Sequence, residues 1–437
     1  MDITDLRAKD TKALKALADQ YDVNGLSRMK KEELIWAILD ASARREGLSI
    51  KDGVLEVLPD NFGFLRDASC LPGKNDIYVS PSQIKRFSLR DGDVVRGTVR
   101  RPKSDEKYFA LLKVQQINFQ DPNAVRHRSD FGDLTPYHPT EQLKLGYDPE
   151  EYSTRIIDLF APIGKGQRGL IVSPPKAGKT TLLKNLAHGI MANHPTIKLI
   201  VLLVDERPEE VTDFKLSLQN GPHDPRYQPE VVAATFDQKP EIHTHITELV
   251  IAKAKRLVEH EFDVVILMDS ITRLARAYNL SITPSGKLLS GGIDPTALYK
   301  PKEFFGAARN LVDLSAERDE RDLPRTCGSL TIIGTALVDT GSRLDSVVFE
   351  EFKGTGNMEL ILDRGLSNKR IFPAIDLELT GTRKEELLLD KQTLRKVWIL
   401  RKMISGSKDK QDALEYIING MRKTENNEQF LELMKNE

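Results

Sequence analysis

The sequence LIVSPPKAGKTT, from Leu170 to Thr181, decides the fold of this chain. A short apolar run followed by a tight loop and Gly-Lys-Thr is typical of a phosphate-binding loop between a buried strand and a helix. In such a loop, backbone N–H groups point at an anion, and the helix dipole adds positive potential. The usual pattern opens with glycine, whereas this chain has Ser173 there. Taken alone, the pattern also fits an ordinary turn between a strand and a helix.

The loop predicts a site for ATP and Mg²⁺. We expect Lys179 to reach the β- and γ-phosphates and the hydroxyl of Thr180 to hold the metal ion. The residues of this predicted nucleotide site are Pro175, Lys176, Ala177, Gly178, Lys179, Thr180 and Thr181.

Two further apolar runs lead to carboxylates. Residues 264–268 precede Asp269, which is expected to order the magnesium shell, and residues 199–204 precede Asp205 and Glu206. Glu206 is placed to polarise an attacking water. Each acid alone also fits a helix N-cap or a solvated loop. Together with Lys179 and Thr180 they predict a nucleotide-hydrolysing site at the carboxyl ends of parallel strands.

The composition is typical of a large cytoplasmic enzyme. The 437 residues can form several cores, and a net charge of −1 means that nucleic-acid affinity must come from local patches. Cys70 and Cys327 argue against a disulfide framework or a cysteine-rich zinc site. We expect no membrane span and no signal peptide, because no apolar run is long enough and the N-terminus lacks the basic and apolar segments.

Periodicity divides the chain into three domains and a linker. Residues 1–48 are expected to form a small helical domain, with apolar residues at helical spacing. Residues 51–118 carry about five short β-rich runs between turn signals, which predicts an OB-fold or cold-shock-like barrel. Residues 119–150 are a proline-containing linker, in which Arg126–Asp130 is expected to be solvated. Residues 151–437 alternate strands and helices, which predicts an α/β domain with a mainly parallel sheet.

Aromatic and cationic residues are interleaved along the predicted barrel. The aromatic residues are Phe62, Phe64, Tyr78 and Tyr108, and the cations among them are Arg66, Arg100, Arg101 and Lys107. Bases can stack on such rings while cations follow the phosphates, which is typical of single-stranded nucleic-acid binding. The alternative is that two or three of the rings belong to the barrel core.

Longer segments resemble one family nearly from end to end. These segments are Asn61–Arg66, Asp76–Gln83, Pro174–Thr180, Asp205–Val211, Asp269–Tyr278, Phe304–Arg309, Gly354–Leu360 and Gly381–Glu386. On these residues the chain resembles the bacterial transcription termination factor Rho family. The resemblance implies a homohexameric ring, with a RecA-like helicase domain driven by ATP. The ring would bind cytosine-rich nascent RNA and release it from RNA polymerase, with elongation factors as further partners.

The resemblance also implies roles for individual residues. The primary RNA site would be formed by Phe62, Phe64, Arg66, Tyr78, Glu106 and Tyr108. Lys287 would grip RNA from a central pore loop, and Arg343 would lie in a second pore loop. Arg383 would be an arginine finger that reaches a neighbour's γ-phosphate, Arg370 a second trans cation, and Phe372 the ring that stacks on adenine.

Two segments depart from the family pattern, and two other classes of protein stay open. Residues 220–229 and 314–326 look longer than the usual connections and are expected to be solvated. A rotary-type ATPase subunit shares the catalytic core and the ring, but has no use for base-stacking rings. A pure RNA-binding regulator would have a degenerate nucleotide site, which the joint presence of Lys179, Thr180, Glu206 and Asp269 argues against.

Overall fold

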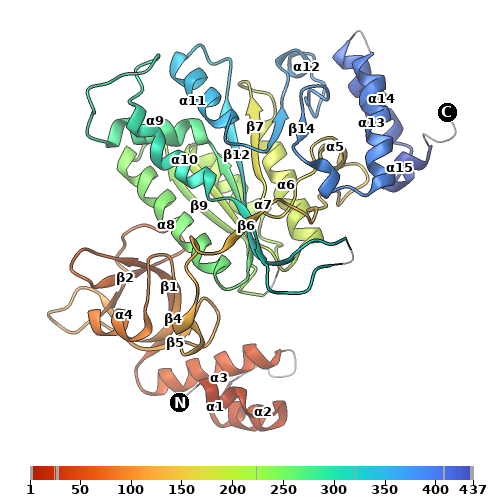
Figure 1. Ribbon diagram of the computed structural model, residues 1–437. Coiled ribbons are helices and arrows are strands. Elements are labelled where there is room, and N and C mark those ends of the chain that lie inside the picture. Colours follow the sequence, from red (N-terminus) through yellow and green to blue (C-terminus); the bar gives the residue numbers. More distant parts are fainter. Residues whose placement is uncertain are drawn as a thin grey trace. The chain divides into compact units, whose positions relative to one another are not determined.

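The structure is a computed structural model that describes residues 3–23, 25, 29–222, 224–319, 321–406 and 409–433 (Figure 1). The chain forms two compact units. One comprises the residues up to Ser129 together with Leu249–Arg256, and the other comprises Asp130–Glu248 and the residues from Leu257 onward.

The first unit begins with three helices, which are α1 (Ile3–Arg7), α2 (Thr11–Gln20) and α3 (Lys31–Arg45). The side chain of Asp10 accepts a hydrogen bond from the backbone of Ala13 at the start of α2, so it satisfies a free N–H group there. The helices bury Leu14, Leu34 and Ile38 against one another. The apolar spacing in the sequence therefore marks the inner faces of this small helical region.

A closed five-stranded barrel follows. Its strands pair in the order β1-β2-β3-β5-β4, and α4 (Pro81–Phe87) connects β3 to β4. The strands are β1 (Ser49–Val57), β2 (Gly63–Arg66), β3 (Ile77–Val79), β4 (Val94–Arg100) and β5 (Phe109–Ile117). Leu55, Leu65, Val79 and Val95 fill the interior. The small OB-like barrel expected from the sequence is confirmed.

The predicted linker is more ordered than the sequence indicates. Val125, in the 3-10 helix η1 (Ala124–His127), is buried in the barrel core. Arg128 lies in the stretch expected to be solvated, yet its guanidinium is buried and donates to both carboxylate oxygens of Asp93, at 2.6 and 2.7 Å. The expectation for Arg128 was wrong, because a buried carboxylate far away in the sequence requires a cation.

The second unit is built around a mostly parallel sheet. Its strands pair in the order β14-β13-β7-β12-β10-β8-β9, with β14 antiparallel, while β11 pairs with the first part of β12 and β6 extends β11. The strands are β6 (Thr135–Tyr137), β7 (Arg168–Ser173), β8 (Lys198–Glu206), β9 (Glu230–Thr235), β10 (Asp263–Asp269), β11 (Arg309–Asp313), β12 (Arg325–Leu337), β13 (Met358–Ile361) and β14 (Gly381–Thr382). The α/β fold with a mainly parallel sheet is confirmed.

Helices cover both faces of this sheet (Figure 1). The helices that follow β6 along the chain are α5 (Tyr152–Phe160), α6 (Lys179–Asn193), α7 (Pro208–Ser217), α8 (Pro240–Val258), α9 (Ile271–Ser281), η2 (Pro295–Leu298), α10 (Tyr299–Gly306), α11 (Arg343–Lys353), α12 (Arg364–Asn368), η3 (Glu385–Leu387), α13 (Lys391–Ser405), α14 (Lys410–Met421) and α15 (Asn427–Leu433).

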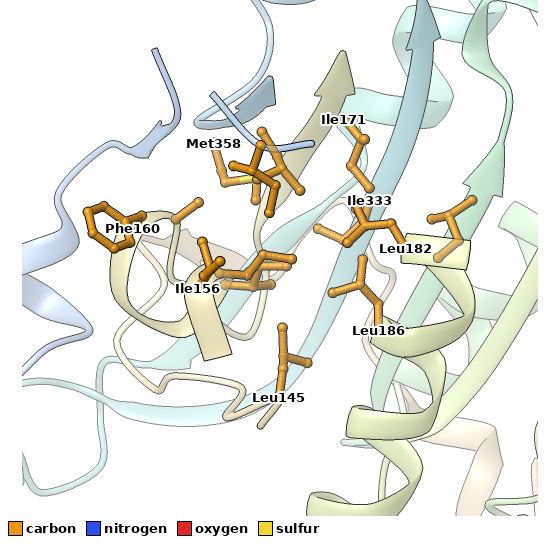
Figure 2. Packing of buried hydrophobic residues seen from close by; sticks show 14 of the residues in the cluster. Leu145, Ile156, Phe160, Ile171, Leu182, Leu186, Ile333 and Met358 are labelled. Atoms are coloured by element: carbon orange, nitrogen blue, oxygen red, sulfur yellow. The ribbon is translucent and has the colours of Figure 1, made fainter. Parts of the chain in front are cut away.

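The main core of the second unit lies on one face of the sheet. Figure 2 shows Ile156 of α5, Ile171 of β7, Leu186 of α6 and Ile333 of β12 pointing toward one another. On the opposite face, a side chain at Gly334 would lie 2.3 Å from Ile271, so glycine lets α9 pack directly on the strand. This close packing fixes α9 next to the end of β10, where Asp269 lies.

Arg155 of α5 links the C-terminal helices to this core through hydrogen bonds. Its buried guanidinium donates to the backbone oxygens of Met421 and Thr424, at 3.0 and 2.9 Å, and to the hydroxyl of Thr424 at 2.8 Å. These acceptors lie between α14 and α15. The carbonyl groups at the end of α14 and just after it therefore have a charged donor.

The two longer segments have anchors within this unit. Beside residues 220–229, the buried Lys198 donates to the backbone oxygen of Gln228 at 2.8 Å and pairs with Glu230 at 2.6 Å. In residues 314–326, Arg321 donates to the backbone oxygen of Thr140 at 3.2 Å, and Leu314 is exposed. Residues 223 and 320 lie outside the described part of the chain.

Candidate functional site

The loop after β7 has the geometry of an anion-binding turn. Gly178 adopts a left-handed conformation with φ of 89°, and α6 begins at the next residue, Lys179. A residue with a side chain is strained at that φ, so glycine is required where the chain turns into the helix. The first N–H groups of α6 are left without intrahelical partners and face the loop.

Asp269 lies at the carboxyl end of β10, opposite the lysine of the loop. Its carboxylate is buried, forms an ion pair with Lys179, and accepts a hydrogen bond from the hydroxyl of Thr335 on the neighbouring strand β12 at 2.8 Å. Both partners engage the same oxygen, Oδ1, while Oδ2 is buried and accepts no hydrogen bond in the described part of the chain. The geometry leaves one carboxylate oxygen available to a ligand.

Glu206 lies in the same crevice, on a strand separated from the loop strand β7 by β12 and β10. It is buried at the end of β8, and Arg273 of α9 approaches its Oε2 atom to 3.3 Å without hydrogen-bond geometry. Burial, followed by the negative charge of Asp269, raises the pKa of Glu206, whereas the charges of Lys179 and Arg273 oppose that shift. A carboxylate with a raised pKa can accept a proton from water more readily than an ordinary one.

Thr180 has a partner that the sequence did not reveal. Its hydroxyl donates to Oε2 of Glu210 in α7 at 3.2 Å. The crevice therefore contains the hydroxyls of Thr180 and Thr335 and the carboxylates of Glu206, Glu210 and Asp269. Two of their oxygens, Oε2 of Glu206 and Oδ2 of Asp269, are buried and accept no hydrogen bond among the described residues. Oxygen ligands of this kind fit Mg²⁺, which binds through few protein groups and keeps several waters.

Phe372 borders the loop on its open side. A β-carbon built on Gly178 would lie 3.5 Å from the ring of Phe372, and about half of this side chain is exposed. Arg370, two residues earlier, is also exposed and adopts a left-handed conformation with φ of 62°. Both residues follow β13, whose end is hydrogen-bonded to β7 through Leu362 and Val172. The structure thus brings an exposed ring beside the phosphate loop.

Arg383 lies at the opposite end of the same sheet. Its backbone N–H donates to the oxygen of Asn357, whose own N–H donates to the oxygen of Arg168 at the start of β7. The phosphate loop follows the other end of β7, at Ser173, and a strand of that length spans about 16 Å. Arg383 is near Arg168, whose pKa is lowered by burial and by the charges of Arg309 and Arg383. The backbone of Arg383 is therefore held far from the phosphate loop of its own chain.

The remaining cations predicted in this unit are Lys287, on the loop between α9 and η2, and Arg343, the first residue of α11. Lys287 and Arg343 are both exposed. A β-carbon on Gly291, in the loop of Lys287, would lie 2.5 Å from the backbone nitrogen of Leu344, so this loop is in direct contact with the start of α11. Asp294 braces the loop of Lys287 by accepting a hydrogen bond from the backbone of Ser285 at 2.6 Å.

The aromatic residues of the barrel form one cluster. Phe62 contacts Phe64 and Tyr78 at ring-centroid distances of 5.8 Å, and Phe64 contacts Tyr108 at 4.8 Å. None of these four rings belongs to the buried barrel core of the described residues, and Tyr78 is exposed. The rings instead present a partly open aromatic surface on β2, β3 and the start of β5.

Arg66 and Glu106 lie near this cluster but already have partners. Arg66 is buried, donates to Glu56 at 2.6 Å and forms an ion pair with Asp76. Its guanidinium lies 5.1 Å from the ring of Phe64, so it supports the cluster from below the surface. Glu106 is exposed and pairs with Arg100, and hydrogen bonds from Arg100 lower the pKa of Glu106 to about 2.

Comparisons with known proteins agree along the whole chain. The chain is 53% identical to transcription termination factor Rho of Thermotoga maritima, and the alignment covers 100% of this chain and 97% of that protein. It is 52% identical to Rho of Bacillus subtilis (100% and 96%) and 50% identical to Rho of Escherichia coli (100% and 100%). The chain belongs to the transcription termination factor Rho family.

Family models match the two units separately. Residues 5–47 match the Rho termination factor N-terminal domain, and residues 51–123 match its RNA-binding domain. Residues 153–380 match the nucleotide-binding domain of the ATP synthase alpha/beta family. The Rho-family barrel and a nucleotide-binding domain are therefore both present. No helix in the described part of the chain is long and apolar enough to cross a membrane.

Solved structures outside the Rho family share the fold of the second unit. An ATPase from the type III secretion system of pathogenic bacteria aligns with a TM-score of 0.52 and 23% identity, over 66% of this chain and 80% of that one. An ATP synthase subunit, NeqB from Nanoarcheaum equitans, aligns with a TM-score of 0.53 and 17% identity, over 69% and 76%. At these identities the likeness concerns the fold alone.

Three residues around the nucleotide crevice were not among the site residues predicted from the sequence. Glu210, Arg273 and Thr335 contact Thr180, Glu206 and Asp269, respectively. Glu210 and Arg273 lie within segments typical of the Rho family, but spacing alone does not show which side chains meet across strands. Thr335 is one of several buried hydroxyl residues in β12, with Ser329 and Thr331, so the sequence gives no signal that separates it from the others.

Proposed function

We propose that this chain is an RNA-stimulated ATPase that moves along cytosine-rich nascent RNA and releases it from RNA polymerase, which ends transcription. The observation that carries this proposal is the presence, in one chain, of an open aromatic cluster on a barrel and a crevice of unsatisfied carboxylate oxygens at a phosphate loop. The first suits stacking of bases, and the second suits hydrolysis of a nucleotide.

Within the crevice, we assign the nucleotide roles predicted from the sequence. Lys179 would stabilise charge on the γ-phosphate, Glu206 would orient the attacking water, and Thr180 and Asp269 would hold Mg²⁺. Phe372 would stack on the base. The loop residues 175–178 and Thr181 would surround the phosphates. Bound Mg²⁺ would supply positive charge to the β- and γ-phosphates during phosphoryl transfer.

The position of Arg383 supports a shared active site. Arg383 is held at the end of the sheet far from its own phosphate loop, so it can serve as an arginine finger only on another subunit's nucleotide. Head-to-tail contacts of this kind generate rings when the rotation closes, and we propose a homohexamer. Arg370, exposed beside Phe372, is proposed as a second cation for a neighbour's nucleotide.

RNA would contact the chain at two places. Phe62, Phe64, Tyr78 and Tyr108 would stack on pyrimidines, with Arg66 and Glu106 contributing to base selection. Lys287, on an exposed loop, and Arg343, at the adjoining start of α11, would contact RNA in the pore of the ring. A cation on a glycine-containing loop can change position with nucleotide state at little conformational cost.

These roles divide the chain as the sequence indicates. We propose a helical domain over residues 1–48, an RNA-binding barrel over 51–118, a connecting segment over 119–150 and the ATPase domain over 151–437. RNA polymerase and elongation factors are proposed as partners, and action on nascent transcripts would take place in the cytoplasm.

The decisive measurement is the rate of ATP hydrolysis with and without poly(C). We expect strong stimulation by the polymer. An equal rate of ATP hydrolysis with and without poly(C) would favour a rotary-type ATPase subunit, whose fold the second unit shares. Binding of poly(C) without any turnover would favour an RNA-binding regulator. Either of these two outcomes would overturn the proposal.

A further inference from the structure

One rim of the barrel carries cations that the proposed RNA contacts do not use. Ser49 pairs with Val99 and Arg100 pairs with Ala110, so β1 begins, β4 ends and β5 begins at the same rim. Tyr108 of the aromatic cluster immediately precedes β5 and therefore lies at this rim. Lys51 of β1 and Arg101, directly after β4, lie there as well.

Lys51 is held in place by an aromatic ring. Its Nζ atom lies 3.6 Å from the centroid of Phe109, the residue after Tyr108. Burial, followed by the charge of Arg101, lowers the pKa of Lys51, so the two cations are close enough to repel each other. Neither has an ion-pair partner in the described part of the chain. Two neighbouring cations without counter-charges attract an anion.

The loop that carries Arg101 is braced. Glu106 accepts two hydrogen bonds from the guanidinium of Arg100 and one from the backbone of Lys103. The same guanidinium donates to the backbone oxygen of Arg101 at 3.2 Å. Arg100 and Glu106 therefore bind each other and the backbone of the loop. These contacts fix the backbone from which the exposed side chain of Arg101 extends.

We propose that Lys51 and Arg101 form a phosphate-binding extension of the RNA site. On this proposal, which rests on the proposed RNA-binding function, a strand leaving Tyr108 continues along the rim and places successive phosphates on the two cations. The aromatic cluster would then select the bases, while the extension would add affinity without base preference. Only an RNA longer than the bases stacked on the cluster would reach it.

The test compares short and long oligocytidylates with the full chain in the Lys287→Ala background, which removes one proposed pore cation. The variant K51M/R101Q keeps much of each side chain's bulk but removes both charges. Its matched control is K85Q/R86Q, which removes two exposed charges from α4. That helix leads from the end of β3 into Val94, which pairs with Val54 rather than with the start of β1.

We expect the affinity of K51M/R101Q for an oligomer of about six nucleotides to fall about tenfold, with dinucleotide binding unchanged. The slope of affinity against salt should fall by about 1.4, because each single-strand phosphate contact contributes about 0.7. K85Q/R86Q should leave both unchanged. Equal losses for both oligomers, no loss, or the same loss in the control would overturn the extension. If the parent protein binds neither oligomer, the proposed RNA-binding function itself fails.

Discussion

The nucleotide crevice and the aromatic cluster of the barrel are built in opposite ways. In the crevice, charged groups are buried and hold one another, as Lys179 and Asp269 do. On the barrel, large rings stay partly open to solvent, and the buried ion pairs lie beneath them, around Arg66. A site for phosphoryl transfer must exclude water and fix charge, whereas a site for bases must keep apolar surface accessible.

The largest expected effect tests whether the crevice is complete within one subunit. Arg383→Ala should reduce ATP turnover by about 10³- to 10⁵-fold, the usual effect of an arginine finger. Mixing this variant with Lys179→Ala should restore some turnover, because certain interfaces then combine an intact Lys179 with an intact Arg383. A nucleotide-bound structure of the ring provides the direct check. Arg383 far from every phosphate in a closed ring would refute the shared site.

The second prediction concerns charge within the crevice. Asp269→Asn and Lys179→Ala should each lower ATP turnover by on the order of 10²-fold or more, because both groups stabilise charge that develops in the transition state. Barrel binding to oligocytidylate should stay nearly unchanged, which filter binding or fluorescence anisotropy would measure. Near-normal turnover in either variant would show that the site is wrongly assigned. Thermal melting of both variants controls for loss of the buried ion pair.

The third prediction separates support from contact on the barrel. Arg66→Ala removes the cation that pairs with the buried carboxylate of Asp76, so we expect a loss of about 3–5 kcal/mol in the free energy of unfolding. Denaturant unfolding of the chain would measure it. If Arg66→Ala instead keeps the parent stability and only relaxes the preference for cytosine, Arg66 acts mainly by reading a base.

The fourth prediction concerns the rings themselves. Replacing Phe64, Tyr78 or Tyr108 by alanine should cost about 1–3 kcal/mol of binding to oligocytidylate, the usual contribution of a stacked base. Melting of each variant should stay close to that of the parent, since these rings lie outside the barrel core. Leu65→Ala provides the matched control, because Leu65 belongs to that core and its loss should lower melting. Affinity and melting falling in step for the rings would make them structural.

The smallest effect concerns a buried carboxylate with no ion-pair partner in the described part of the chain. Asp158 accepts hydrogen bonds from the backbone of Leu145 and Gly146, and burial raises its pKa to about 7. Because the folded state holds this proton more tightly than the unfolded state, stability should fall as pH rises from about 4 to about 7. Between pH 5 and pH 6 the free energy of unfolding of the parent protein should fall by about 1 kcal/mol because of Asp158, and Asp158→Asn should lack this fall. Denaturant unfolding at both pH values measures it. An identical pH profile in both proteins would contradict the assignment.

Local sequence determined much of this architecture. The apolar run and Gly-Lys-Thr around Lys179 predicted β7, the loop and α6, and the short β-rich runs between turn signals predicted the barrel strands. The interleaved aromatic residues and cations indicated a base-stacking surface, and the rings of Phe62 and Phe64 are in contact. These features could be predicted because strand and helix periods, turns and loop chemistry act over a few neighbouring residues.

Tertiary structure alone decided which distant residues meet. Strand order brings Thr335 beside Asp269, places Arg383 at the end of the sheet away from its own phosphate loop, and pairs Arg128 with Asp93. Glu210 reaches Thr180 only because α7 packs next to α6. A period or a motif shows which face a residue occupies but not which strand lies next to it. An unpaired buried charge lowers the stability of the fold, so these buried charges pair with the counter-charges that the fold places near them.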